Sequence, residues 1–139
     1  MTTATPLRPT ARPLDEIVEY RNERVLERYV IDHGGTMSDA RDRFEALKQF
    51  MIVCSVKPGI KVTSAEIDDM WHTFLLFTIQ YREFCSDWLG RFIEHEPFEA
   101  AQPEYYGITR SFAHDLFGEL DARFWPAEGK ADCSSGCGT

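Results

Sequence analysis

The sequence predicts one all-α domain of about four helices, with an irregular loop after a long third helix. Apolar residues recur at helical spacing over most of the chain, and strand-like alternation is limited to the short stretch at residues 60–62. The 139 residues include 43% hydrophobic and 13% aromatic side chains, which is enough for a hydrophobic core without disulfide bonds. We expect a helical domain at residues 14–126, between a disordered segment at 1–13 and a flexible, Cys-containing tail at 127–139.

The N-terminal segment contains Pro6, Pro9 and Pro13, which favour an extended and poorly ordered chain. From Leu14 to Val30 the apolar residues recur at helical spacing, and this pattern predicts the first helix. The sequence His33-Gly34-Gly35 ends that helix, because glycine readily takes the left-handed conformation that a helix stop requires.

A second helix is predicted to begin at Ser38, which can cap its N-terminus. The sequence Lys57-Pro58-Gly59 closes it. Its predicted inner face consists of Phe44, Leu47, Phe50, Met51 and Cys54.

The third predicted helix begins at Thr63-Ser64-Ala65-Glu66, which has the form of a capping box with Thr63 as the cap. It extends to Leu89, and Gly90 is its stop. The next residues, 91–103, form an irregular connection, because two prolines prevent one continuous helix there. A fourth helix follows, marked by Phe112, Leu116, Phe117 and Leu120, and Phe124-Trp125-Pro126 folds back onto the core.

The overall charge narrows the classes of partner. A formal net charge of −8 repels phosphate backbones and anionic lipids, so we expect no nucleic acid and no membrane partner. No apolar stretch approaches the roughly 20 residues that span a bilayer. The first residues lack the apolar block of a secretion signal, and we therefore expect a cytoplasmic protein.

Asp68 and His72 are the most informative residues, because they interrupt an otherwise apolar helix. At about 100° per residue both fall at the border of its buried face. Burying such groups costs free energy unless each finds a partner. An aspartate four residues before a histidine can accept a hydrogen bond from one ring nitrogen, which leaves the other nitrogen for a proton or a metal ion.

A metal site needs further ligands, and His95 is the first candidate. Pro97 keeps the residue before it extended, so the loop can return the imidazole of His95 to the helix. Cys85 follows His72 by thirteen residues and would lie on nearly the opposite side of a continuous helix, so we assign it to the core. The ligand types favour a transition metal, with zinc as the first candidate.

Other interpretations fit the same residues. Asp68 and His72 can simply satisfy each other at the edge of the core, or His72 can act as a general acid or base. Cys133 and Cys137 lie in a small, polar tail, where two thiols can bind a metal ion, form a disulfide or be modified, or where they can be an inert frayed end.

One ordered set of residues resembles the glycine-rich domain-containing protein family. In that family's pattern an acid precedes Trp-His, a Tyr and a Cys follow, and a Gly leads to a second His. The corresponding residues here are Asp68, Trp71, His72, Tyr81, Cys85, Gly90 and His95. The resemblance covers Ile67 to Pro97 and implies an all-α domain of unsettled activity. Many plant relatives read Trp-His-x-His, whereas this chain has Phe74 at the last position.

Our first hypothesis is a small cytoplasmic helical protein that binds a transition metal through His72 and His95, with Asp68 orienting or completing the site. The second is a non-catalytic interaction module that meets a protein partner through aromatic side chains. Its expected anchors are Trp88, Tyr105 and Tyr106. The third is a carrier whose Cys133 and Cys137 tail is the working part.

Overall fold

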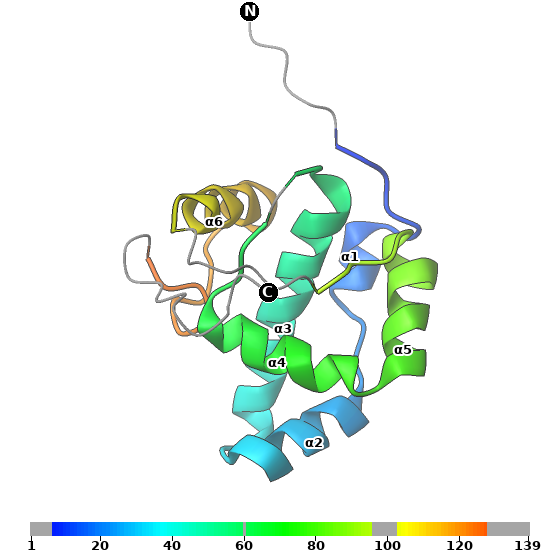
Figure 1. Cartoon of the computed structure of the whole chain (residues 1–139), viewed down its shortest axis with the longest axis vertical. Helices are drawn as coiled ribbons and strands as arrows, with labels where there is room; N and C mark the ends of the chain where they lie inside the picture. Colours follow the sequence, from blue (N-terminus) through cyan, green and yellow to red (C-terminus); the bar gives the residue numbers. More distant parts are fainter. Residues whose placement is uncertain (1–6, 60, 96–102, 128–139) are drawn as a thin grey trace, which may run out of the picture.

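The computed structural model describes residues 7–59, 61–95 and 103–127 (Figure 1). These residues form six α-helices and one π-helical segment, and no strand occurs among them. The elements are α1 (Leu14–Ile17), α2 (Glu23–His33), α3 (Met37–Val56), α4 (Ala65–Leu75), α5 (Thr78–Glu83), η1 (Phe84–Leu89) and α6 (Pro103–Phe117). The prediction of a single all-α domain is confirmed.

Helix α3 runs through the centre of the domain, and α2, α4, α6 and η1 pack against it (Figure 1). Eleven of its 20 residues are buried. From Ala46 to Val56 the helix is buried on nearly all sides, and such a segment is stable only when other elements cover it, which explains this central place. The residues predicted for its inner face are buried, except for Cys54, which is only partly buried.

The predicted first helix is divided into α1 and α2. Residues 18–22 between them belong to neither helix, and the Asn22 side chain caps α2 by accepting a hydrogen bond from the Val25 amide at 3.3 Å. The buried Lys48 ammonium group of α3 donates hydrogen bonds to the carbonyl oxygens of Val18 and Tyr20, both at 2.7 Å. A distant side chain therefore satisfies the carbonyls that the break exposes.

The predicted third helix is also divided, into α4, α5 and η1, with a corner at Leu76 and Phe77 (Figure 1). On a straight helix ten residues rise about 15 Å. The rings of Phe74 and Phe84 are ten residues apart in sequence, and yet their centroids lie 5.7 Å from each other. The corner therefore lets aromatic residues of α4 and η1 pack into one core, which a continuous helix would prevent.

Two helices begin at a different residue from the one predicted. Thr36, not Ser38, caps α3 by accepting from the Asp39 amide at 3.0 Å. Ser64, not Thr63, caps α4 by accepting from the Ile67 amide at 3.2 Å. The Ser64 hydroxyl also donates to the Phe124 carbonyl, which ties the start of α4 to the end of the described chain.

The segments outside the helices pack against them. Arg8 donates from its backbone amide to the Val56 carbonyl at 2.8 Å, and the Arg12 amide donates to the Trp88 carbonyl at 3.1 Å. Residues 8–12 thus lie along the ends of α3 and η1, while residues 1–6 lie outside the described range, as does the tail from residue 128. The predicted return of Phe124 and Trp125 to the core is confirmed, because both are buried.

No helix in the described part of the chain is long and apolar enough to cross a membrane.

Candidate metal centre

Three side chains of the types that bind metals lie together at the outer face of α4. Asp68 and His72 are one turn apart on that helix, and His95 comes from the segment after η1. One potential ligand atom from each residue lies within 4.8 Å of the other two. Among residues 7–59, 61–95 and 103–127 this is the one group of three or more His, Cys, Asp or Glu side chains that meets this condition.

The Asp68 carboxylate is the centre of the group. Its side chain is 5% exposed, and each of its oxygens faces a different imidazole. Oδ1 lies 2.9 Å from Nε2 of His95, and Oδ2 lies 3.4 Å from Nε2 of His72. The shorter distance is that of a charge-assisted hydrogen bond, whereas the longer one is an ion-pair contact when His72 is protonated.

The two histidines differ in their exposure to solvent. The His95 side chain is 13% exposed, whereas that of His72 is 54% exposed. The expectation that both Asp68 and His72 border the core is therefore wrong for His72, whose ring points outward while Asp68 is buried. The ring centroids of the two histidines are 4.6 Å apart. Because Asp68 and His95 are largely buried and His72 is not, the group has one buried side and one side open to solvent.

The distances in the group are compatible with a tetrahedral metal centre. Zinc bonds of about 2.0–2.1 Å place neighbouring ligand atoms roughly 3.3–3.4 Å apart. The 3.4 Å from Asp68 Oδ2 to His72 and the 2.9 Å from Asp68 Oδ1 to His95 are close to this value, but they involve different carboxylate oxygens. With one ligand atom taken from each residue, the three atoms lie within 4.8 Å of one another, so small side-chain movements would bring them around one ion. Two imidazole nitrogens and one carboxylate oxygen are a donor set that zinc and other divalent transition metals accept.

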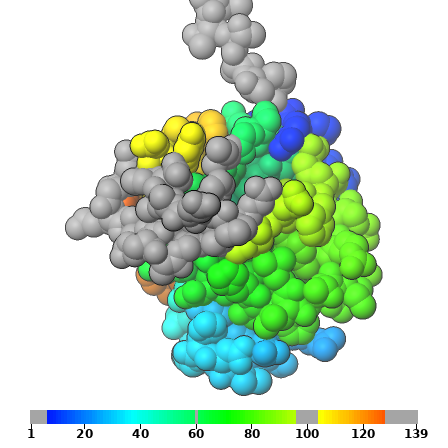
Figure 2. Space-filling model, viewed as in Figure 1, coloured from blue at the N-terminus to red at the C-terminus, as the bar shows by residue number. Residues whose placement is uncertain are grey.

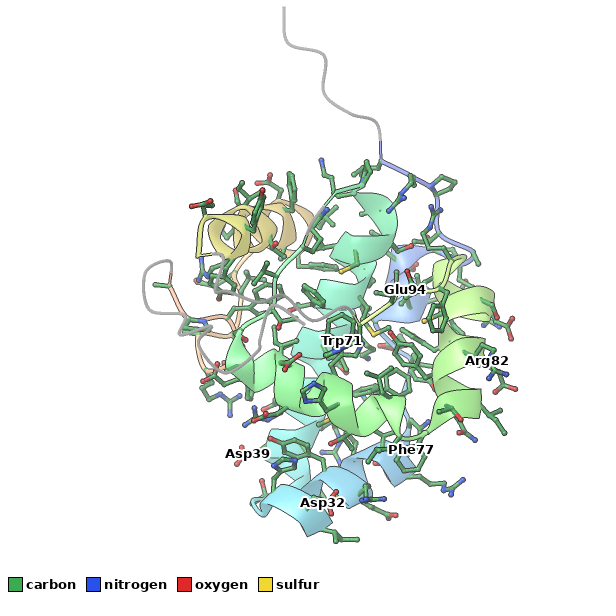
Figure 3. The ribbon with its side chains drawn as sticks, in the orientation of Figure 1. Asp32, Asp39, Trp71, Phe77, Arg82 and Glu94 are labelled. Carbon is green, nitrogen blue, oxygen red and sulfur yellow. The ribbon has the colours of Figure 1, made fainter. Side chains whose placement is uncertain are left out.

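His95 reaches the group because η1 stops abruptly. Gly90 has a φ of 91°, and the chain then runs back along α4 without helical structure. The His95 ring packs edge-on against the Trp71 ring at a centroid distance of 4.3 Å. Figure 3 shows the labelled Trp71 side chain between α4 and the segment that carries Glu94. The expected irregular connection is thus present at residues 91–95, while 96–102 lie outside the described residues.

Two buried hydrogen bonds hold this returning segment. The Trp71 indole N–H donates to the Tyr81 hydroxyl at 3.0 Å, and the Tyr81 hydroxyl donates to the Ile93 carbonyl at 2.5 Å. Burial raises the pKa of Tyr81 well above its usual range, so its hydroxyl keeps the proton that it donates. The sequence analysis gave Tyr81 no role of its own, because a hydrogen bond to a carbonyl twelve residues away leaves no local pattern.

The two cysteines in the described residues, Cys54 and Cys85, are not part of the group. Cys85 is fully buried, which confirms its assignment to the core, and burial raises the pKa of its thiol. Because the thiolate is the form that binds metals, such burial makes Cys85 a poor ligand. Cys133 and Cys137 lie outside the described residues.

The aromatic residues expected to anchor a partner are more covered than their sequence positions suggested. Tyr106 is 1% exposed and its hydroxyl donates to the Pro126 carbonyl, so it cannot serve as a surface anchor. Trp88 is partly buried, and the Arg12 guanidinium group lies 3.9 Å from its ring centroid. The interaction module itself stays a prediction, without Tyr106 among its anchors.

The fold and the site together define a small all-α domain with a cluster of one aspartate and two histidines at the surface of α4. A family model described as UCP032817-like matches residues 15–115, which include every helix from α2 to α5 and most of α1 and α6. The chain belongs to this family, which is uncharacterised. The resemblance to the glycine-rich domain-containing family is therefore wrong, since the family match is to a different group. No curated protein and no solved structure matches the chain significantly.

Proposed function

We propose that the protein binds a divalent transition-metal ion, with zinc as the first candidate, through Asp68, His72 and His95. The observation that supports this proposal is the buried carboxylate whose two oxygens face the Nε2 atoms of two imidazoles, at 2.9 and 3.4 Å. A hydrogen bond between Asp68 and one histidine would be enough for a purely structural pair. The second imidazole is 54% exposed, so burial in the core does not explain its place beside the carboxylate.

The donor set determines which metals are expected. Calcium and magnesium prefer oxygen ligands, whereas imidazole nitrogen suits zinc, iron, nickel and copper. Two histidines and one carboxylate occur both in zinc centres and in non-haem iron(II) centres. Zinc and iron(II) are therefore the two ions to compare, and magnesium serves as the negative control.

Metal binding to the full-length, untagged protein tests the proposal. Calorimetric titration with zinc should give one site per chain, and His95→Ala and Asp68→Asn should each abolish or strongly weaken that site. His114→Ala is the matched control, because His114 is an exposed histidine of α6 that lies outside the group. The proposal fails if wild-type protein binds no zinc or iron(II), or if the control loses as much binding as the variants of the site.

The interaction module and the Cys133 and Cys137 carrier remain alternative hypotheses. A protein that stays folded without metal and shows no metal site in this titration would favour one of them.

A further inference from the structure

We propose that Tyr81 is a positioning residue for the metal centre, and that its hydroxyl fixes the place of His95 by holding the Ile93 carbonyl. This inference rests on the proposed function. It concerns a residue that does not belong to the proposed ligand set.

The first step of the argument is the continuity of the hydrogen bonds. Trp71 donates to the Tyr81 hydroxyl, and Tyr81 donates to the Ile93 carbonyl, at 3.0 and 2.5 Å. The three residues are 3%, 2% and 7% exposed, so water does not compete for these bonds. The chain of bonds therefore links α4, through α5, to the segment that carries His95.

The second step concerns what this link holds in place. Ile93 lies two residues before His95 in a segment without helical hydrogen bonds of its own. The Trp71 ring also packs edge-on against the His95 ring in the same segment. Trp71 is also the sequence neighbour of His72. Both the ring contact and the chain of hydrogen bonds therefore begin at Trp71 on α4, the helix that carries the other two proposed ligands.

The third step is the geometric demand of the site. Affinity for a metal depends on ligand atoms that are already held near the bonding geometry, and removal of a supporting hydrogen bond typically weakens binding by about 10–100-fold. His95 is the ligand that comes from outside α4. Its position relative to Asp68 is consequently the one that the tertiary structure must maintain, and Tyr81 supplies the hydrogen bond nearest to it in the chain.

Core packing alone is the competing explanation for Tyr81, and a second buried tyrosine allows a direct comparison. Tyr106 is as well buried as Tyr81, and its hydroxyl likewise donates to a backbone carbonyl, that of Pro126, at 2.7 Å. It lies on α6, outside the group of Asp68, His72 and His95. Tyr81→Phe and Tyr106→Phe therefore remove the same group from the same kind of environment.

The experiment measures zinc affinity and thermal stability of the full chain for wild type, Tyr81→Phe and Tyr106→Phe. We expect both variants to lose stability, but only Tyr81→Phe to weaken zinc binding, by about tenfold or more. Equal affinity of Tyr81→Phe and wild type, or equal losses in the two variants, would overturn the inference. If Tyr81→Phe does not fold, Trp71→Phe removes the first bond of the chain and should weaken binding in the same direction; unchanged affinity would again overturn it.

A second readout separates this inference from the proposed function. In metal-free protein, nuclear magnetic resonance of the His95 ring nitrogens reports the hydrogen bond to Asp68. We expect Tyr81→Phe to weaken that bond and Tyr106→Phe to leave it intact. If wild type binds no zinc while this difference is observed, the proposed function fails and the positioning role stands. If the His95 signals are the same in both variants, the positioning role fails.

Discussion

Replacement of Gly90 by alanine tests how the chain is turned toward the candidate metal centre. Gly90 follows η1 with a φ of 91°, in the left-handed region, and its amide donates to the Cys85 carbonyl at 2.8 Å. A β-carbon added here would lie 3.1 Å from the backbone nitrogen of Ala11. Because that nitrogen belongs to the main chain of the packed N-terminal segment, it cannot move aside as the end of a long side chain would.

Gly118 provides a control with the same backbone conformation and no neighbour. Its φ is 78°, its amide donates to the His114 carbonyl at 2.8 Å, and a β-carbon there would meet nothing within 4 Å. Left-handed geometry costs an alanine about 1–2 kcal/mol, and overpacking typically adds about 1–3 kcal/mol. We therefore expect Gly118→Ala to lower the free energy of unfolding by about 1–2 kcal/mol and Gly90→Ala by about 2–5 kcal/mol.

Thermal and urea unfolding of the two variants measures this difference. Specific unfolding entropies give about 0.3 kcal/mol per degree for a chain of this length, so Gly118→Ala should lose about 3–7 °C and Gly90→Ala about 7–17 °C in Tm. Equal losses of Tm in the two variants would show that residues 8–12 move away from the added methyl group with no loss of stability, and that their packing against the domain is weak. A Gly90→Ala variant as stable as wild type would refute the left-handed turn itself.

Three further predictions follow from other parts of the structure. Zinc at 100 times its dissociation constant should raise the free energy of unfolding by about 2.7 kcal/mol, which corresponds to a Tm increase of about 9 °C. This increase should vanish in His95→Ala, and a similar increase with magnesium would contradict the proposed donor set. Burial raises the pKa of Cys54 to about 12 and also raises the pKa of Tyr81, so the unfolded chain loses these protons at lower pH than the folded chain. The free energy of unfolding, measured with urea, should therefore fall above about pH 9, and Cys54→Ala should make this fall less steep. A free energy of unfolding that rises with pH in this range would refute the reasoning. Lys48→Met should lower the free energy of unfolding by about 2 kcal/mol in the same assay, because two carbonyls lose their hydrogen-bond donor. A variant more stable than wild type would show that the desolvation of the ammonium group is larger than the stabilisation from its hydrogen bonds.

The candidate centre is open to solvent on the side of His72, whose side chain is 54% exposed. Figure 2 shows α2, α4 and α5 exposed on one face of the molecule. His72 belongs to α4 and is the most exposed of the three proposed ligands. Its substitution should remove one ligand and leave the Asp68 to His95 hydrogen bond in place, whereas substitution of His95 removes both a ligand and that hydrogen bond. Binding data for His72→Ala beside His95→Ala would separate these two contributions.

The sequence by itself determined the features that depend on neighbours a few residues apart. Helical spacing of apolar residues predicted the all-α class, and the helix stop at His33-Gly34 is where the pattern placed it. The spacing of Asp68 and His72 predicted that they share one face, because residues four apart are neighbours on any α-helix. Their separation of 3.4 Å follows from α4 alone.

Only the tertiary structure decided the features that depend on distant residues. The breaks before α2 and after α4 exist because Lys48 satisfies the carbonyls at the first and because aromatic packing of Phe74 with Phe84 requires the second. A local sequence pattern does not reveal either cause, because the interacting residues are ten or more positions apart in the sequence. His95 reaches Asp68 across 27 residues, through the stop at Gly90 and the hydrogen bond from Tyr81, and its contact depends on how the whole domain packs.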